Sequence, residues 1–106
     1  MINAEIIRGE SGNVIGFKVA NHGESIVCAA VSMLVLNTVN SIEALTEDDF
    51  NCEYNDEGGY LEFTLNNPSF QTTGVKTLLD AMVLGLTSTL EQYPSEISLT
   101  DPIVRK

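Results

Sequence analysis

Residues 26–45 read IVCAAVSMLVLNTVNSIEAL, a largely apolar segment that contains neither proline nor glycine. The segment is too long for a single strand, so it predicts a helix. Ser25 precedes it and is a candidate N-cap, because a serine hydroxyl can accept a hydrogen bond from an amide of the first turn. The first three turns are apolar nearly all round, which predicts that the helix is buried on more than one side: the sheet covers one side, and a subunit interface is a candidate for another.

The segments around this helix are shorter and are separated by turn residues. Strands are predicted at residues 2–8, 14–20, 50–55, 60–65 and 96–100, and a second helix at about 72–93, with a loose tail at 101–106. The turn residues at 10–13 (ESGN) and 55–59 (NDEGG) join neighbouring strands into hairpins. The order ββαββαβ predicts an α+β fold, in which two helices pack on a mostly antiparallel sheet, with residues 1–106 in a single domain.

The charge balance limits the kinds of partner. Fifteen acidic residues face five basic ones, which gives a formal net charge of -10. Binding to nucleic acid phosphates needs clustered Lys and Arg, and the five basic residues are scattered, so we expect no direct nucleic-acid partner. An acidic surface attracts basic partners, although the same charge can serve solubility alone.

The number of cysteines and the length of the apolar stretches indicate in which cellular compartment the protein is expected. Cys28 and Cys52 are too few for a disulfide framework. No signal peptide is recognised before the strand at 2–8. The longest apolar stretch, residues 26–36, stops at Asn37 and falls short of the roughly 20 residues of a membrane span. We therefore expect a cytoplasmic protein with reduced thiols and no membrane partner.

The one histidine, His22, lies six residues before Cys28. If Ser25 is the N-cap, Cys28 is the third helical residue, where the helix dipole favours a thiolate over a thiol. Free N–H groups of the first turn can then bind the oxyanion that forms when a carbonyl is attacked. A thiolate with an imidazole in reach is the minimal equipment for acyl transfer, so His22 and Cys28 are the candidate catalytic residues.

The same residues also have plainer interpretations. A free cysteine often only fills space in a core, and a lone histidine in a loop is commonly inert. A zinc site made of His22, Cys28 and Cys52 would lack a fourth ligand. Thiol redox chemistry would lack a CxxC motif. We expect neither a metal nor a cofactor.

The segment around Cys28 resembles a known family. Residues 25–32 (SIVCAAVS), closely preceded by residues 21–23 (NHG), are similar to the signature of the ribosomal-processing cysteine protease (Prp) family, and the similarity extends along the chain to residues 58–60 and 90–94. The resemblance implies a homodimer with His22 and Cys28 as a catalytic dyad. It implies removal of an N-terminal extension from the precursor of a large-subunit ribosomal protein, the one numbered twenty-seven. The alternative is a non-catalytic dimeric module that binds a basic ribosomal or ribosome-assembly partner.

The chain departs from the family pattern next to the dyad. Asn21, Gly23 and Ser25 stand where the family usually has Gly, Ala and Asp, and the connection from His22 to Cys28 is shorter than in many members. Glu24 is the nearest candidate to orient the histidine. Ser32 matches a family serine one turn after Cys28, where its hydroxyl can hydrogen-bond near the thiolate or to the helix backbone.

Overall fold

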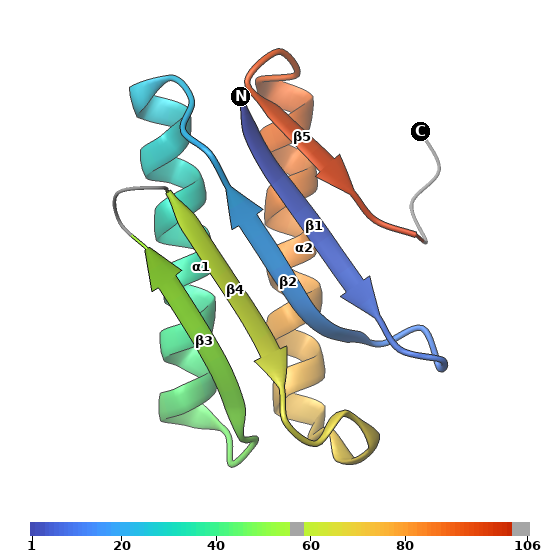
Figure 1. Cartoon of the computed structure of the whole chain (residues 1–106). Helices are drawn as coiled ribbons and strands as arrows, with labels where there is room; N and C mark the ends of the chain where they lie inside the picture. Colours follow the sequence, from blue (N-terminus) through green and yellow to red (C-terminus); the bar gives the residue numbers. More distant parts are fainter. Residues whose placement is uncertain (56–58, 103–106) are drawn as a thin grey trace.

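The computed structural model describes residues 1–55 and 59–102, and its elements follow the predicted order (Figure 1). In chain order they are β1 (Ile2–Arg8), β2 (Val14–Ala20), α1 (Ser25–Leu45), β3 (Phe50–Asn55), β4 (Tyr60–Leu65), a short 3-10 helix (Pro68–Phe70), α2 (Thr73–Gln92) and β5 (Ile97–Thr100). The predicted α+β class is confirmed, whereas the 3-10 helix was not predicted. Of the predicted hairpin turn at 55–59, residues 56–58 lie outside the described residues.

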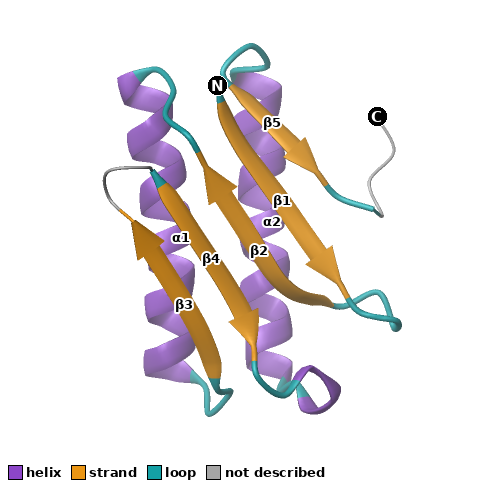
Figure 2. Cartoon of the chain, viewed as in Figure 1, coloured by secondary structure: helices purple, strands orange, loops and turns teal. Residues whose placement is uncertain are grey.

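The five strands form one sheet in the order β3-β4-β2-β1-β5. Neighbouring strands are antiparallel, except that β1 and β5 are parallel. Both helices lie on the same face of this sheet (Figure 2). The fold therefore has two layers, as the sequence pattern predicted.

The core lies between the sheet and the helices. Successive strand residues point to opposite faces of a sheet, so a half-covered strand buries every second side chain. In β1, Ile2, Ala4 and Ile6 are buried, whereas Asn3 and Glu5 are exposed. The alternation explains why the strand pattern was readable from the sequence.

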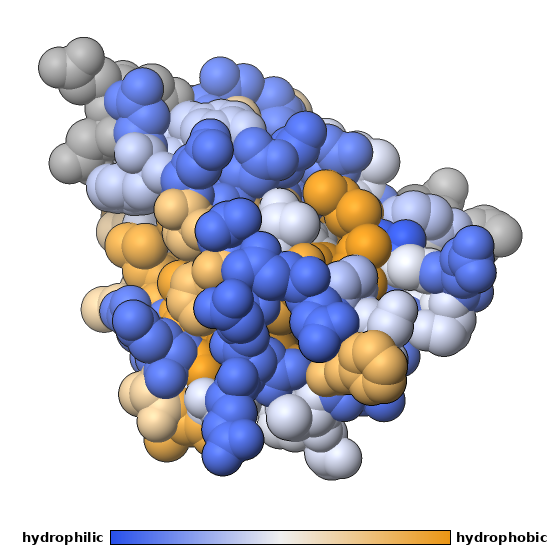
Figure 3. All heavy atoms as spheres, turned by 60° about the horizontal axis from the view of Figure 1, so that its bottom comes forward, coloured by the Kyte–Doolittle hydropathy of each residue, from blue (hydrophilic) through white to orange (hydrophobic). Residues whose placement is uncertain are grey.

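α1 buries a single stripe of side chains against the sheet: Val27, Val31, Val35, Thr38, Val39 and Ile42. On its other sides Ile26 and Met33 are 66% and 72% exposed. Apolar groups reach the surface elsewhere too, as Figure 3 shows at one end of the molecule. Packing against the sheet and α2 leaves the flank with Ile26 and Met33 open in the single chain, so burial of α1 on a second side, at a subunit interface, stays a prediction.

α1 is also long and apolar enough, by length and composition alone, to cross a membrane. No segment of this kind was predicted from the sequence, because the apolar stretch was taken to end at Asn37. Core helices of soluble proteins meet the same criterion, and the buried stripe of α1 packs on the sheet. The property is therefore weak support for a membrane span.

An ion pair holds the chain just after β5. The Arg8 guanidinium donates two hydrogen bonds of 2.8 Å to the carboxylate of Asp101, whose side chain is 1% exposed. The hydrogen bond with Asp101 raises the pKa of Arg8 above its ordinary value. The predicted loose tail is thus wrong at Asp101, while residues 103–106 lie outside the described residues.

Candidate active site

Glu24, not Ser25, caps the helix that carries Cys28. Glu24 has an extended backbone (φ -61°, ψ 143°), and its side chain accepts hydrogen bonds from the N–H groups of Ile26 and Val27 at 3.0 and 3.3 Å. Ser25 is instead the first helical residue. Although serine is the better N-cap by preference, the Glu24 carboxylate also lies at the positive end of the helix dipole, which stabilises it there.

The change of cap alters which amides are available to an oxyanion. Cys28 becomes the fourth helical residue, and its N–H donates to the Glu24 carbonyl at 2.8 Å. The N–H groups of Ile26 and Val27 are occupied by the cap, so the expectation that free first-turn amides bind the oxyanion is wrong for these two. Among the described residues Ser25 retains the unoccupied N–H of this turn.

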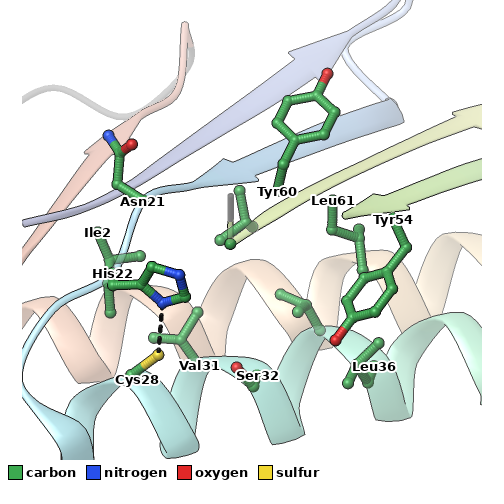
Figure 4. Close-up of a pocket in the computed structure, with 13 residues that line it drawn as sticks. Ile2, Asn21, His22, Cys28, Val31, Ser32, Leu36, Tyr54, Tyr60 and Leu61 are labelled. Carbon is green, nitrogen blue, oxygen red and sulfur yellow. Dashed lines mark hydrogen bonds between the residues drawn. The ribbon is translucent and has the colours of Figure 1, made fainter. Parts of the chain in front are cut away.

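The structure brings the two candidate catalytic residues together. Nδ1 of His22 lies 3.9 Å from Sγ of Cys28 (Figure 4). His22 is exposed and Cys28 is half-buried, so the thiol lies at the surface and not deep in the core. A distance of 3.9 Å is within the range of a hydrogen bond that involves sulfur. Hydrogen bonds between catalytic residues are also often longer than usual in a site without ligand.

The backbone before His22 takes a turn that few residues accept. Asn21 has φ 75°, in the left-handed region that favours glycine and tolerates asparagine better than most other residues. This conformation gives a physical reason for the glycine that the resemblance implies at this position, and for asparagine in its place.

The linker from His22 to α1 is fixed from both sides. The amino group of Met1 donates to the His22 carbonyl at 3.2 Å, and the Glu24 N–H donates to Oε1 of Glu96 at 3.2 Å. The sequence offered Glu24 as the candidate to orient the imidazole, and this expectation is wrong, because the Glu24 carboxylate is engaged as the helix cap.

Gly59, in the β3–β4 connection, contacts the other edge of the imidazole. The sequence pattern predicted a turn at this glycine, and the resemblance to the Prp family includes it, but neither indicated a contact with His22. Its φ is +60°, and a Cβ atom at this position would lie 2.7 Å from Nε2 of His22. The contact joins segments 37 residues apart, so no local pattern could have indicated it.

A pocket of about 100 Å³ opens beside Cys28. Its walls are mainly apolar and include Val35, together with Val31, Leu36, Tyr54 and Leu61 (Figure 4). Asn21 and Ser32 add polar groups to the lining. Among the described residues, the Ser32 hydroxyl hydrogen-bonds neither to the Cys28 sulfur nor to the backbone of α1. The pocket suits an apolar side chain of a bound peptide.

Cys52 lies apart from this pocket. It is exposed on the edge strand β3, and desolvation by burial of part of the side chain raises the pKa of its thiol. The described residues contain no group of three or more His, Cys, Asp or Glu side chains that could hold a metal ion. Cys28 is therefore the thiol with an imidazole beside it.

Acyl transfer through a thiol is the chemistry that such a pairing serves, and it places the protein among the cysteine proteases. The family model described as cysteine protease Prp matches residues 1–98. The chain belongs to this family.

Individual relatives agree with this assignment over nearly the whole chain. The ribosomal processing cysteine protease Prp of Staphylococcus aureus is 30% identical over 105 residues, which cover 93% of this chain and 97% of the relative. Its crystal structures with a covalently linked product peptide and with a substrate peptide are 27% and 26% identical to this chain, and each has a TM-score of 0.87. Each of these two matches covers 94% of this chain and 98% of the other.

Proposed function

We propose that this protein is an endopeptidase that removes the N-terminal extension of a large-subunit ribosomal protein, the one numbered twenty-seven, with Cys28 as nucleophile and His22 as base. The observation that carries the proposal is the 3.9 Å contact between Nδ1 and Sγ beside an apolar pocket. The Staphylococcus aureus relative is a ribosomal processing protease, and this similarity supports the substrate class.

The reaction proceeds through a thioester. His22 takes the proton of the Cys28 thiol, the thiolate attacks the scissile carbonyl carbon, a C–S bond forms, and the carbonyl oxygen takes the negative charge. The tetrahedral intermediate collapses, the C–N bond breaks, and His22 gives its proton to the leaving amine. His22 then takes a proton from water as the water oxygen attacks the thioester, the C–S bond breaks, the acid product leaves, and His22 returns the proton to the sulfur.

The N-terminus of α1 stabilises the negatively charged species of this reaction. Its dipole places about half a positive charge near Cys28, which stabilises both the thiolate and the oxyanion. The Glu24 carboxylate offsets part of that field, because it occupies the same helix end. The Ser25 N–H is the first-turn donor left for the oxyanion.

Charge and surface chemistry fit the proposed setting. A chain with a net charge of -10 attracts a basic ribosomal protein and raises the rate of encounter. The proposal includes the cytoplasm as the compartment and a homodimer as the assembly. Two copies of so acidic a chain would meet with least repulsion at α1, where Glu43 is the one charged residue among 21 and Ile26 and Met33 are exposed.

The test is incubation with a peptide that spans the extension, with the products identified by mass spectrometry. The wild-type protein should cleave at one bond, and Cys28→Ala and His22→Ala should each lose cleavage while they stay folded. Cys52→Ala is the matched control and should cleave at the wild-type rate. Normal turnover by Cys28→Ala would overturn the assignment and leave the non-catalytic binding module as the interpretation.

A further inference from the structure

The two edges of the His22 ring have different neighbours. Nδ1 faces Sγ of Cys28, and Nε2 faces Gly59. A Cβ atom on residue 59 would lie 2.7 Å from Nε2, 2.8 Å from Cε1 and 3.1 Å from Cδ2. Two of these distances are shorter than a Cβ atom tolerates, so the ring occupies space that any side chain at position 59 would need.

In a catalytic triad a third side chain usually holds the imidazole by a hydrogen bond. Here, within residues 1–55 and 59–102, no side chain hydrogen-bonds to Nε2, and Glu24 is engaged as the helix cap. Among these residues, packing is what remains to orient the ring. His22 is otherwise exposed, and an exposed side chain changes rotamer freely unless something blocks it.

Gly59 can provide this block because its backbone is anchored. It directly precedes β4, whose first residue, Tyr60, pairs with Asn55 of β3. On the other side, the His22 carbonyl is fixed by the amino group of Met1. The ring therefore lies between two pieces of held backbone, and rotation of Nδ1 away from Cys28 would drive the ring into Gly59.

We propose that Gly59 is a positioning residue of the active site, which by lacking a side chain lets the β3–β4 backbone pack on the imidazole and keep Nδ1 turned toward the thiol. The role rests on the proposed function of His22 and Cys28. It replaces the hydrogen bond of a third catalytic residue by a steric contact.

The test compares variants that add a Cβ atom at two left-handed glycines. Gly59→Ala adds the clash with the ring together with backbone strain. Gly12→Ala is the matched control, because Gly12 also has a positive φ (91°) but lies in the β1–β2 turn and does not line the pocket. Gly59→Asn is the second variant, since asparagine tolerates this backbone yet still carries the Cβ atom.

Two readouts do not depend on cleavage. The chain has one histidine, so the imidazole signals in a carbon–proton NMR spectrum belong to His22 alone. The rate of Cys28 alkylation by iodoacetamide across pH reports how well the imidazole supports the thiolate. We expect Gly59→Ala and Gly59→Asn to shift the ring signals and to change the alkylation profile, and Gly12→Ala to leave both as in the wild type.

Cleavage of the extension peptide supplies the third readout. Loss of a positioned base costs about 100-fold or more, so kcat should fall at least about ten-fold in both Gly59 variants, with KM changed much less. Unchanged ring signals and alkylation in a folded Gly59 variant would overturn the positioning role even if the wild type cleaves. If the wild type cleaves nothing, the function fails, and the NMR and alkylation results still decide whether Gly59 orients the ring.

Discussion

The Glu24 carboxylate accepts a hydrogen bond of 3.0 Å from the N–H of Ile26, two residues further along the chain. This short-range contact starts α1 and sets Cys28 as its fourth residue. It also uses amides that would otherwise face the site. The helix start is therefore organised by an acidic cap directly beside a thiol whose ionised form needs positive surroundings.

Loss of this cap should destabilise the fold. Glu24→Ala removes the acceptor for two amides and should lower the free energy of unfolding by about 1 kcal/mol. Glu24→Gln keeps an acceptor oxygen and should lose less. Urea denaturation measures the differences. Ser25→Ala is the control and should stay within about 0.5 kcal/mol of the wild type; a larger loss than in Glu24→Ala would show that Ser25 is the cap.

The left-handed backbone before His22 predicts an ordering of substitutions at Asn21. Asn21→Ala should cost about 1 kcal/mol, because a Cβ atom without a compensating polar group is disfavoured at φ 75°. Asn21→Gly should stay within about 0.5 kcal/mol of the wild type, since glycine adopts this conformation without strain. Thermal or urea unfolding reports both, and equal losses in the two variants would contradict the explanation.

Removal of one partner of the Arg8–Asp101 ion pair should destabilise the fold more than removal of both. Asp101→Asn leaves a guanidinium that is 15% exposed without its charge partner, and should destabilise by about 3 kcal/mol. The double variant Arg8→Met with Asp101→Leu removes both charges and should lose clearly less. Chemical denaturation of the three proteins provides the comparison. A double variant as unstable as the single one would rule out the buried charge as the cause.

Asp48 should make part of the stability sensitive to acid. Desolvation raises its pKa, but hydrogen bonds from the Thr72 side chain and N–H and from Thr46 together outweigh it, so the pKa lies below the ordinary 3.8. A carboxylate with a lowered folded-state pKa contributes stability above pH 3.8, and that contribution is lost as pH falls through the folded pKa.

Asp48→Asn cannot ionise and removes this dependence. Its stability should approach that of the wild type as pH is lowered from about 5 to below 3.8, as measured by urea midpoints at each pH. Glu47→Gln, in the same loop with an exposed side chain, serves as the control. A constant difference between Asp48→Asn and the wild type over this range would refute the link to Asp48 ionisation.

The sequence predicted the layers of this fold because burial imposes local periods. The alternation in β1 and the helical spacing of the apolar residues in α2 are short-range patterns, and both elements begin and end within a residue of their predicted limits. The proximity of His22 and Cys28 was predictable for a similar reason, since five residues separate them and a helix start fixes one of the two.

Some features could not be predicted because they depend on contacts between residues far apart in the sequence, or on which of two adjacent residues caps a helix. Asp101 was placed in a loose tail because its partner, Arg8, lies 93 residues away. Gly59 was taken as a turn residue because only the folded hairpin brings it against His22. Ser25 ranks above Glu24 as a cap in general, and the local backbone of Glu24 reversed that order here.

In the proposed reaction the Cys28 thiol forms a covalent bond with the substrate carbonyl while His22 moves the proton. Quenching the reaction with the extension peptide in acid and mapping the adduct by mass spectrometry tests this step. We expect the N-terminal fragment as a thioester on Cys28, never on Cys52, and no adduct in Cys28→Ala. An adduct on Cys52, or cleavage by Cys28→Ala at the wild-type rate, would contradict it.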